Sequence, residues 1–96
     1  MTPFKLSTEA EQDLRSIYLY TYRNFGEEQA DKYLSGLENA FQMISSNPRI
    51  GRERPDIDPL VRCMEHGKHV IFYDLHEDHI LIVRVLHGRM DVKKHL

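Results

Sequence analysis

Six residues in the second half of the chain have side chains of the types that could cleave RNA. Attack by a 2′-hydroxyl needs a base, an acid for the leaving oxygen and cations around the crowded phosphate. The residues of these types are Arg62, His66, His69, Tyr73, Arg84 and His87. We expect Arg62 and Arg84 on different strands with Tyr73 between them. A ribonuclease site made of Arg62, Tyr73, Arg84 and His87 is therefore kept as an alternative interpretation.

Two histidine pairs and one cysteine raise the question of metal or nucleophilic chemistry. His66 and His69, like His76 and His79, stand three residues apart. Both pairs fall at expected hairpin turns without the third and fourth ligands that zinc takes, so we expect solvated turn histidines and no metal. Cys63 is expected to be a small buried hydrophobe, because no nearby base marks it as a nucleophile. The sequence predicts no cofactor.

Positive charge is concentrated in the closing run RVLHGRMDVKKHL. Residues 84–96 carry a net charge of +3, whereas residues 8–46 carry −4 and the whole chain carries −2. The overall charge argues against general or sequence-specific nucleic-acid binding by the chain alone. The cationic run is consistent with a contact surface for another macromolecule or with a solvated tail, and composition alone leaves both open.

Length and composition predict one domain over residues 1–96. The chain has one cysteine, so an internal disulfide is impossible, and this usage is typical of a reducing cytoplasm. No charged-then-apolar leader is present, and no apolar run approaches the roughly 20 residues of a membrane helix. We therefore expect a soluble, cytoplasmic protein.

The first half of the chain predicts a short strand followed by a helical hairpin. Residues 3–6 alternate apolar and polar, and Thr8 and Glu11 match a capping box. Apolar residues then recur at helical spacing up to Gly26 and again up to Asn47-Pro48. The first stripe contains Ala10, Leu14, Ile17, Tyr18, Thr21, Tyr22 and Phe25; the second contains Ala30, Tyr33, Leu34, Leu37, Ala40, Phe41 and Ile44. Gly36 lies within the second helix, which predicts a close approach there.

The second half predicts a loop and three strands. The run NPRIGRERPDIDP, residues 47–59, holds three prolines and reads as a long loop. Residues 60–66, 68–75 and 79–87 are rich in Val, Ile, Phe and Tyr and are separated by turn residues, which indicates an antiparallel meander. The order β-α-α-β-β-β predicts an α+β fold of two layers, with an antiparallel helical hairpin on one face of a mostly antiparallel sheet.

Two helices can cover only one face of that sheet. In the last strand one parity contains Ile82, Arg84 and Leu86, and we expect this set to lie on the uncovered face. An exposed apolar face of this kind predicts a docking surface for a partner.

The order of elements and several runs resemble the ParE branch of the RelE/ParE toxins of bacterial toxin–antitoxin pairs. The similarity extends from LSTEAEQDLRSIYLYTYRNFG through NPRIGRERPDI and HVIFYDL to the closing RVLHGRMDVKKHL. The phrase VLHGRMD after an Ile/Val strand is the most telling part. The resemblance implies a RelE-like fold, inhibition of DNA gyrase by stabilising its cleaved-DNA state, and a hetero-oligomer with a ParD-type antitoxin.

The resemblance also assigns expected roles to residues. The charged contact with gyrase or its DNA would use Arg84, His87, Arg89, Lys93 and Lys94. The antitoxin would contact the outer side of the hairpin and the open sheet face, through Tyr20, Ile82, Arg84 and Leu86. Ribosome-dependent ribonucleases of the same superfamily are strongly basic, and a net charge of −2 departs from that pattern. A relative that binds partners without being toxic is the third interpretation.

Overall fold

Ser7 begins the first helix and ties it to the sheet. In the computed structural model, which describes residues 1–96, the Ser7 hydroxyl accepts a hydrogen bond from the Ala10 N–H at 2.9 Å and caps α1 (Thr8–Phe25). The same hydroxyl donates to the Val83 carbonyl at 2.7 Å. The capping box expected at Thr8 and Glu11 is therefore wrong by one residue, because Ser7 satisfies a free helix amide and also bonds to the last strand.

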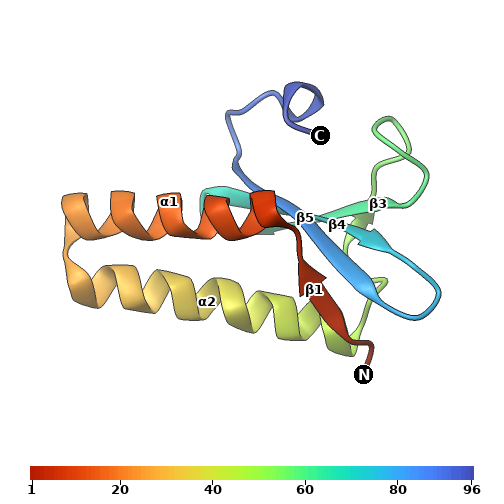
Figure 1. Cartoon of the computed structure of the whole chain (residues 1–96), viewed down its shortest axis with the longest axis horizontal. Coiled ribbons are helices and arrows are strands. Elements are labelled where there is room, and N and C mark those ends of the chain that lie inside the picture. Colours follow the sequence, from red (N-terminus) through yellow and green to blue (C-terminus); the bar gives the residue numbers. More distant parts are fainter.

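A single glycine separates the two helices. Gly26, at φ 91°, lies in the left-handed region that favours glycine, and it ends α1 and precedes α2 (Glu27–Ser46). The Tyr18 hydroxyl donates to the Asp31 carboxylate across the pair at 2.7 Å. Figure 1 shows the helices side by side and running past one end of the sheet. The predicted antiparallel hairpin is confirmed.

Five strands form one mixed sheet. The strands are β1 (Phe4–Leu6), β2 (Arg52–Glu53), β3 (Val61–His66), β4 (His69–Leu75) and β5 (Ile80–His87), and a short 3₁₀ helix, η1 (Val92–Lys94), follows them. Their order across the sheet is β1-β5-β4-β3-β2, with β1 parallel to β5 and all other pairs antiparallel. The expected α+β class and mostly antiparallel sheet are confirmed, whereas β2 was expected to be loop.

The main core lies between the helices and one face of the sheet. Its buried members are Ala10, Leu37, Ala40, Phe41, Ile44, Ile71, Tyr73, Ile80, Ile82 and Val85. The close approach predicted at Gly36 is also found, because an added Cβ there would meet the His66 ring at 2.8 Å. The helical hairpin is thus held against the sheet without space for even one more carbon at this point.

A second, smaller core covers the opposite face of the sheet. Val61, Cys63, Phe72 and Leu86 are buried there, under Ile57 from the long loop and Val92 from η1. Figure 1 places the loop before β3 and the C-terminal segment on the side of the sheet away from α2. Cys63 is only 3% exposed, as expected for a small core residue.

The expectation of an open apolar sheet face is wrong. Ile82 is fully buried and Leu86 is 2% exposed. Phe72 pairs with Arg84 and Tyr73 with Ile82, so Val83 is an extra residue and forms a bulge. The bulge reverses the side-chain alternation, which sends Ile82 and Leu86 to opposite faces, and each face is covered. Neither side chain is therefore exposed for the antitoxin contact that the sequence predicted.

The last turns of α1 also differ from the predicted core stripe. Tyr22 is 48% exposed and Phe25 67% exposed, although both were expected to be buried. This part of the hairpin extends past the sheet, so no strand lies beneath it (Figure 1). Helical spacing predicted which side of α1 is apolar, but not how far the sheet extends along it.

Candidate functional site

Tyr73 and Arg62 together hold the loop between α2 and β3. The Tyr73 side chain is fully buried; its hydroxyl donates to the Pro48 carbonyl at 2.7 Å and accepts from the Gly51 N–H at 2.9 Å. Burial raises the pKa of this hydroxyl. Arg62 donates to the Gly51 carbonyl at 2.8 Å and to Glu53 at 3.0 Å. Both side chains are occupied with loop structure, and the buried hydroxyl cannot reach an RNA strand.

Arg84, within β5, forms an internal ion pair with Asp13. Its guanidinium makes two hydrogen bonds to the Asp13 carboxylate, both at 2.8 Å, and the Val85 N–H donates to the same carboxylate at 3.0 Å. Hydrogen bonding to Asp13 raises the pKa of Arg84. A further bond reaches the His95 carbonyl at 3.0 Å. Arg84 therefore joins α1, β5 and the C-terminal segment, and it is not a free cation for a partner.

His87 is the last residue of β5 and lies in a group of aromatic side chains. Its ring contacts His69 edge-on, with centroids 5.5 Å apart. The Tyr33 hydroxyl lies 2.7 Å from Nδ1 of His69 and donates to the His66 carbonyl at 3.1 Å. Burial, followed by the neighbouring His87 and His66, lowers the pKa of His69 below its ordinary value. His66 and His69 are half-buried parts of the packed fold, not the solvated turn residues expected.

The four residues of the ribonuclease interpretation do not converge. Tyr73 pairs with Ile82 on β5, whereas His87 pairs with His69, four residues back along β4. Four residues of strand span roughly 13 Å, which is too far for two groups acting on one phosphate. With Arg62 and Arg84 bound within the chain, these four side chains do not form a site in which an acid, a base and a cation meet.

A polar hollow of about 570 Å³ lies beside His87. Its lining comes from α1, from the β3–β4 turn with the adjoining ends of both strands, and from the end of β5 with the residues after it. The lining residues are Tyr20, Glu65, Gly67, Lys68, His69, Val70, His87, Gly88 and Arg89. Two residues that sequence analysis assigned to different partners, Tyr20 and Arg89, thus border the same space. Lys68 was missed, because only the strand pairing brings the turn beside the end of β5: the Gly88 N–H donates to the Lys68 carbonyl at 2.9 Å.

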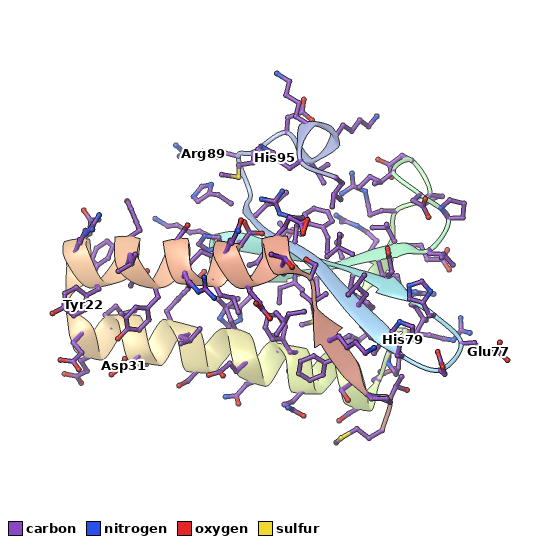
Figure 2. All side chains as sticks on the ribbon, in the orientation of Figure 1. Tyr22, Asp31, Glu77, His79, Arg89 and His95 are labelled. Atoms are coloured by element: carbon purple, nitrogen blue, oxygen red, sulfur yellow. The ribbon has the colours of Figure 1, made fainter.

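The remaining cations of the C-terminal run lie on the segment after β5. Arg89, Lys93 and Lys94 are exposed, and none forms an ion pair. Figure 2 shows Arg89 and His95 on this segment, at the other side of the ribbon from α2. Asp91 caps η1 by accepting from the Lys93 N–H at 3.1 Å, so the segment has a defined shape.

Neither a metal centre nor a membrane span is found. No three His, Cys, Asp or Glu side chains lie together in a way that could hold a metal ion. His76 and His79 stack at 4.6 Å in the β4–β5 turn, and His79 bonds to Asp78 at 2.7 Å. Glu77 and His79 mark that turn at the far end of the sheet from the hairpin tip (Figure 2). Neither helix is long and apolar enough to cross a membrane.

An apolar surface lies on the outer half of α1. Leu19, Tyr22 and Phe25 are 49%, 48% and 67% exposed and lie within about a third of the helix circumference, since each residue turns the helix by roughly 100°. Figure 2 places Tyr22 at the tip of the hairpin, beyond the sheet. We call these three residues the hairpin-tip surface. Spacing alone had assigned two of them to the core.

The family match and the relatives found by sequence comparison agree with one another. Residues 4–92 match the family described as ParE toxin of type II toxin-antitoxin system, parDE. The chain is 42% identical to Toxin ParE1 of Mycobacterium tuberculosis over 97% of this chain and 96% of that protein. It is 34% identical to Toxin ParE1 of Caulobacter vibrioides, over 100% and 99% of the two chains. It is 31% identical to Toxin ParE of Escherichia coli, over 100% and 94%.

Solved structures support the same fold. A chain of the chromosomal ParDE toxin–antitoxin system from P. aeruginosa superposes with a TM-score of 0.77 at 24% identity, over 91% of this chain and 96% of that one. A chain of the toxin–antitoxin complex RelBE2 from Mycobacterium tuberculosis superposes at 0.68 and 20% identity, over 90% and 96%. These two superpositions confirm the predicted RelE-like fold.

Proposed function

The chain belongs to the ParE toxin family of type II toxin–antitoxin systems, and on that premise we propose that it stops growth by binding DNA gyrase in the cytoplasm. The toxin would associate more tightly with gyrase that holds cleaved DNA than with gyrase that holds intact DNA. Such a difference in affinity shifts the enzyme population toward the cleaved state, so that double-strand breaks persist. The protein itself makes and breaks no bond.

One observation carries the choice of binding over RNA cleavage. The four side chains that could cut RNA are separated along the sheet, and three of them are occupied within the chain: Tyr73, Arg62 and Arg84. Other cations remain exposed and without an ion pair, among them Lys68 on the turn before β4 and Arg89, Lys93 and Lys94 on the segment after β5. This distribution favours a surface that contacts a charged macromolecule.

The direct test is a supercoiling assay with purified gyrase and plasmid DNA. We expect the chain to block supercoiling and to accumulate linear plasmid, while messenger RNA on translating ribosomes stays intact. RNA cut at defined positions, with gyrase unaffected, would contradict the proposal and support the ribonuclease interpretation. A chain inactive in both assays would support the non-toxic one.

The C-terminal cations are the proposed contact with gyrase or its DNA. Removing the whole segment would be a poor test, because Val92 covers the second core and the His95 carbonyl bonds to Arg84. We therefore choose Arg89→Glu with Lys93→Glu and Lys94→Glu, three exposed residues whose reversal keeps the packing. Inhibition of gyrase should fall at least tenfold, whereas unchanged inhibition would place the contact elsewhere.

We further propose that a ParD-type antitoxin covers the hairpin-tip surface. Its three large apolar side chains are each about half exposed or more, which is unusual for a surface that stays in water. A disordered antitoxin segment can fold onto them as it binds. The toxin and antitoxin would thus form a hetero-oligomer, with Tyr20 near the same contact.

Calorimetric titration with the antitoxin tests this surface. Leu19→Glu with Phe25→Glu should weaken binding at least tenfold, since each buries apolar area worth about 1 kcal/mol or more. Met43→Glu on α2 is the matched control, because Met43 is 52% exposed but lies outside the hairpin-tip surface. Equal losses in both variants, or none in either, would count against the assignment.

A further inference from the structure

The polar hollow presents two cations that the fold leaves without a partner. Lys68 and Arg89 are exposed and form no ion pair, whereas Arg54, Arg62 and Arg84 are each paired with a carboxylate. An unpaired lysine and an unpaired arginine bordering one concave space mark a place for an anionic ligand.

Packing and a hydrogen bond fix the backbone segments that carry these two cations. Gly67 has φ 57°, and a Cβ there would meet the Tyr33 hydroxyl at 2.7 Å, so the turn that carries Lys68 needs glycine and packs directly on α2. The Gly88 N–H bonds to the Lys68 carbonyl, which fixes the start of the C-terminal segment beside the turn. The two cations consequently come from two anchored segments at one end of the sheet.

The rest of the lining fits a ligand that has an aromatic ring and hydrogen-bonding groups as well as negative charge. Tyr20 is 64% exposed and brings an aromatic side chain to the border of the hollow. Nδ1 of His87 accepts from the Arg89 N–H at 3.2 Å, so a neutral His87 carries its proton on Nε2 and can donate. Glu65 adds one carboxylate, which disfavours a small, densely charged anion but can accept from the amino group of a base.

We propose that the hollow is a binding site for a nucleic-acid strand, in which Lys68 and Arg89 each hold one backbone phosphate and Tyr20 stacks on a neighbouring unpaired base. Cations around an aromatic face are the usual means of holding single strands without reading their sequence. Unpaired bases are available at a strand break, and this inference rests on the proposed function for the choice of broken DNA as the strand.

Fluorescence anisotropy with the full chain and a labelled 12-nucleotide DNA strand tests the site without gyrase. We expect the logarithm of the association constant to fall linearly with the logarithm of the salt concentration. The slope should be near −1.4, about −0.7 for each of two phosphate contacts. Lys68→Glu with Arg89→Glu should weaken binding more than tenfold and bring the slope toward zero. Tyr20→Ala should weaken it about tenfold while leaving the slope unchanged.

The matched control is Lys5→Glu with Lys32→Glu, which makes the same change of net charge at two exposed lysines outside the hollow. Affinity within about twofold of the unmodified chain is expected. An equal loss in both double variants would overturn the site, because general charge would then explain the binding. No binding by the unmodified chain would overturn it as well. Urea unfolding of each variant verifies the fold, and Tyr20→Ala decides the matter if a charge variant is unfolded.

Other ligands define the remaining outcomes. An abasic strand or inorganic phosphate that binds as well as the DNA strand would overturn the stacking contact, and a polyglutamate peptide that does so would overturn the nucleic-acid assignment. An RNA strand that binds ten times tighter than DNA would overturn the choice of broken DNA. Supercoiling assays with the same variants separate the two proposals: strand binding without any effect on gyrase would refute the proposed function and keep the site.

Discussion

The two ends of the β4–β5 pair use similar side chains in opposite ways. At one end, Tyr73 and the neighbouring Arg62 are saturated by hydrogen bonds to the loop before β3. At the other end, Tyr20, Lys68 and Arg89 border a hollow with their polar groups unoccupied. Residue type alone does not distinguish these regions. The difference teaches that a candidate site is recognised by polar groups that the fold leaves unpaired, and not by the presence of suitable side chains.

The sharpest test of this contrast removes one hydroxyl from each region. Tyr73→Phe leaves the Pro48 carbonyl and the Gly51 N–H without their partner, and each unsatisfied buried group costs about 1–3 kcal/mol. We expect the free energy of unfolding, measured in urea, to fall by roughly 2–4 kcal/mol. Tyr20→Phe is the control and should change it by less than about 0.5 kcal/mol. Similar losses at both positions would erase the contrast.

Asp13→Asn should have the next largest effect. The carboxylate accepts from two guanidinium nitrogens of Arg84 and from the Val85 N–H, and both side chains of the pair are mostly buried. Charged hydrogen bonds of this kind contribute about 1.5–3 kcal/mol, and we expect a loss of that size in urea unfolding. Asp56→Asn is the control, since the Asp56–Arg54 pair lies in an exposed loop. A smaller loss at Asp13 than at Asp56 would contradict the structural role of Arg84.

Gly67→Ala tests whether the hollow needs its turn. The substitution places a side chain at φ 57° and against the Tyr33 hydroxyl, so we expect a loss of about 1–2 kcal/mol in the free energy of unfolding. Gly88→Ala makes the same change where an added Cβ would meet its nearest atom, the Lys68 carbonyl, at an ordinary 3.5 Å. It should cost less. If Gly88→Ala were the more damaging variant, the turn would not be the anchored part of the hollow.

His69→Gln is expected to have the smallest effect, visible in the pH dependence of stability. Burial and the nearby His87 and His66 lower the pKa of His69 in the folded chain, so the unfolded chain binds its proton more readily. The contribution of neutral His69 to stability is therefore fully present above pH 6.5, the ordinary pKa that applies in the unfolded chain. It is lost as the pH falls below that value. Unfolding midpoints between pH 5 and 7 should vary less in His69→Gln than in the unmodified chain. An unchanged pH dependence in His69→Gln would contradict this assignment.

Periodicity predicted the elements well, because each element reflects its own local pattern. The helix stripes ended at Gly26 and Asn47 as expected, and the three long strands were found within one or two residues. The bulge at Val83 was not predictable in this way. It depends on how β5 meets β4 and β1, and one extra residue there reversed the faces of Ile82 and Leu86.

The candidate site was only partly predictable for the same reason. The cationic run and the exposed Tyr20 were recognised from charge and spacing. Lys68 could be identified as a site residue only from the strand pairing, which places it beside Gly88. Arg84 and Asp13 are 71 residues apart in the chain. The sequence around Arg84 therefore does not reveal that its guanidinium is bound within the protein. Long-range contacts thus decide which charges are free, and no local pattern encodes them.

The pairing of β1 with β5 has a consequence for biosynthesis. Phe4 and Ile80 are partners in the parallel ladder, and β5 lies between β1 and all the other strands. A ribosome must therefore release nearly the entire polypeptide before the first strand finds its place, since closure over such a separation comes late in folding. Products that end before β5 lack Ile80, Ile82, Val85 and Leu86, so they cannot complete either core.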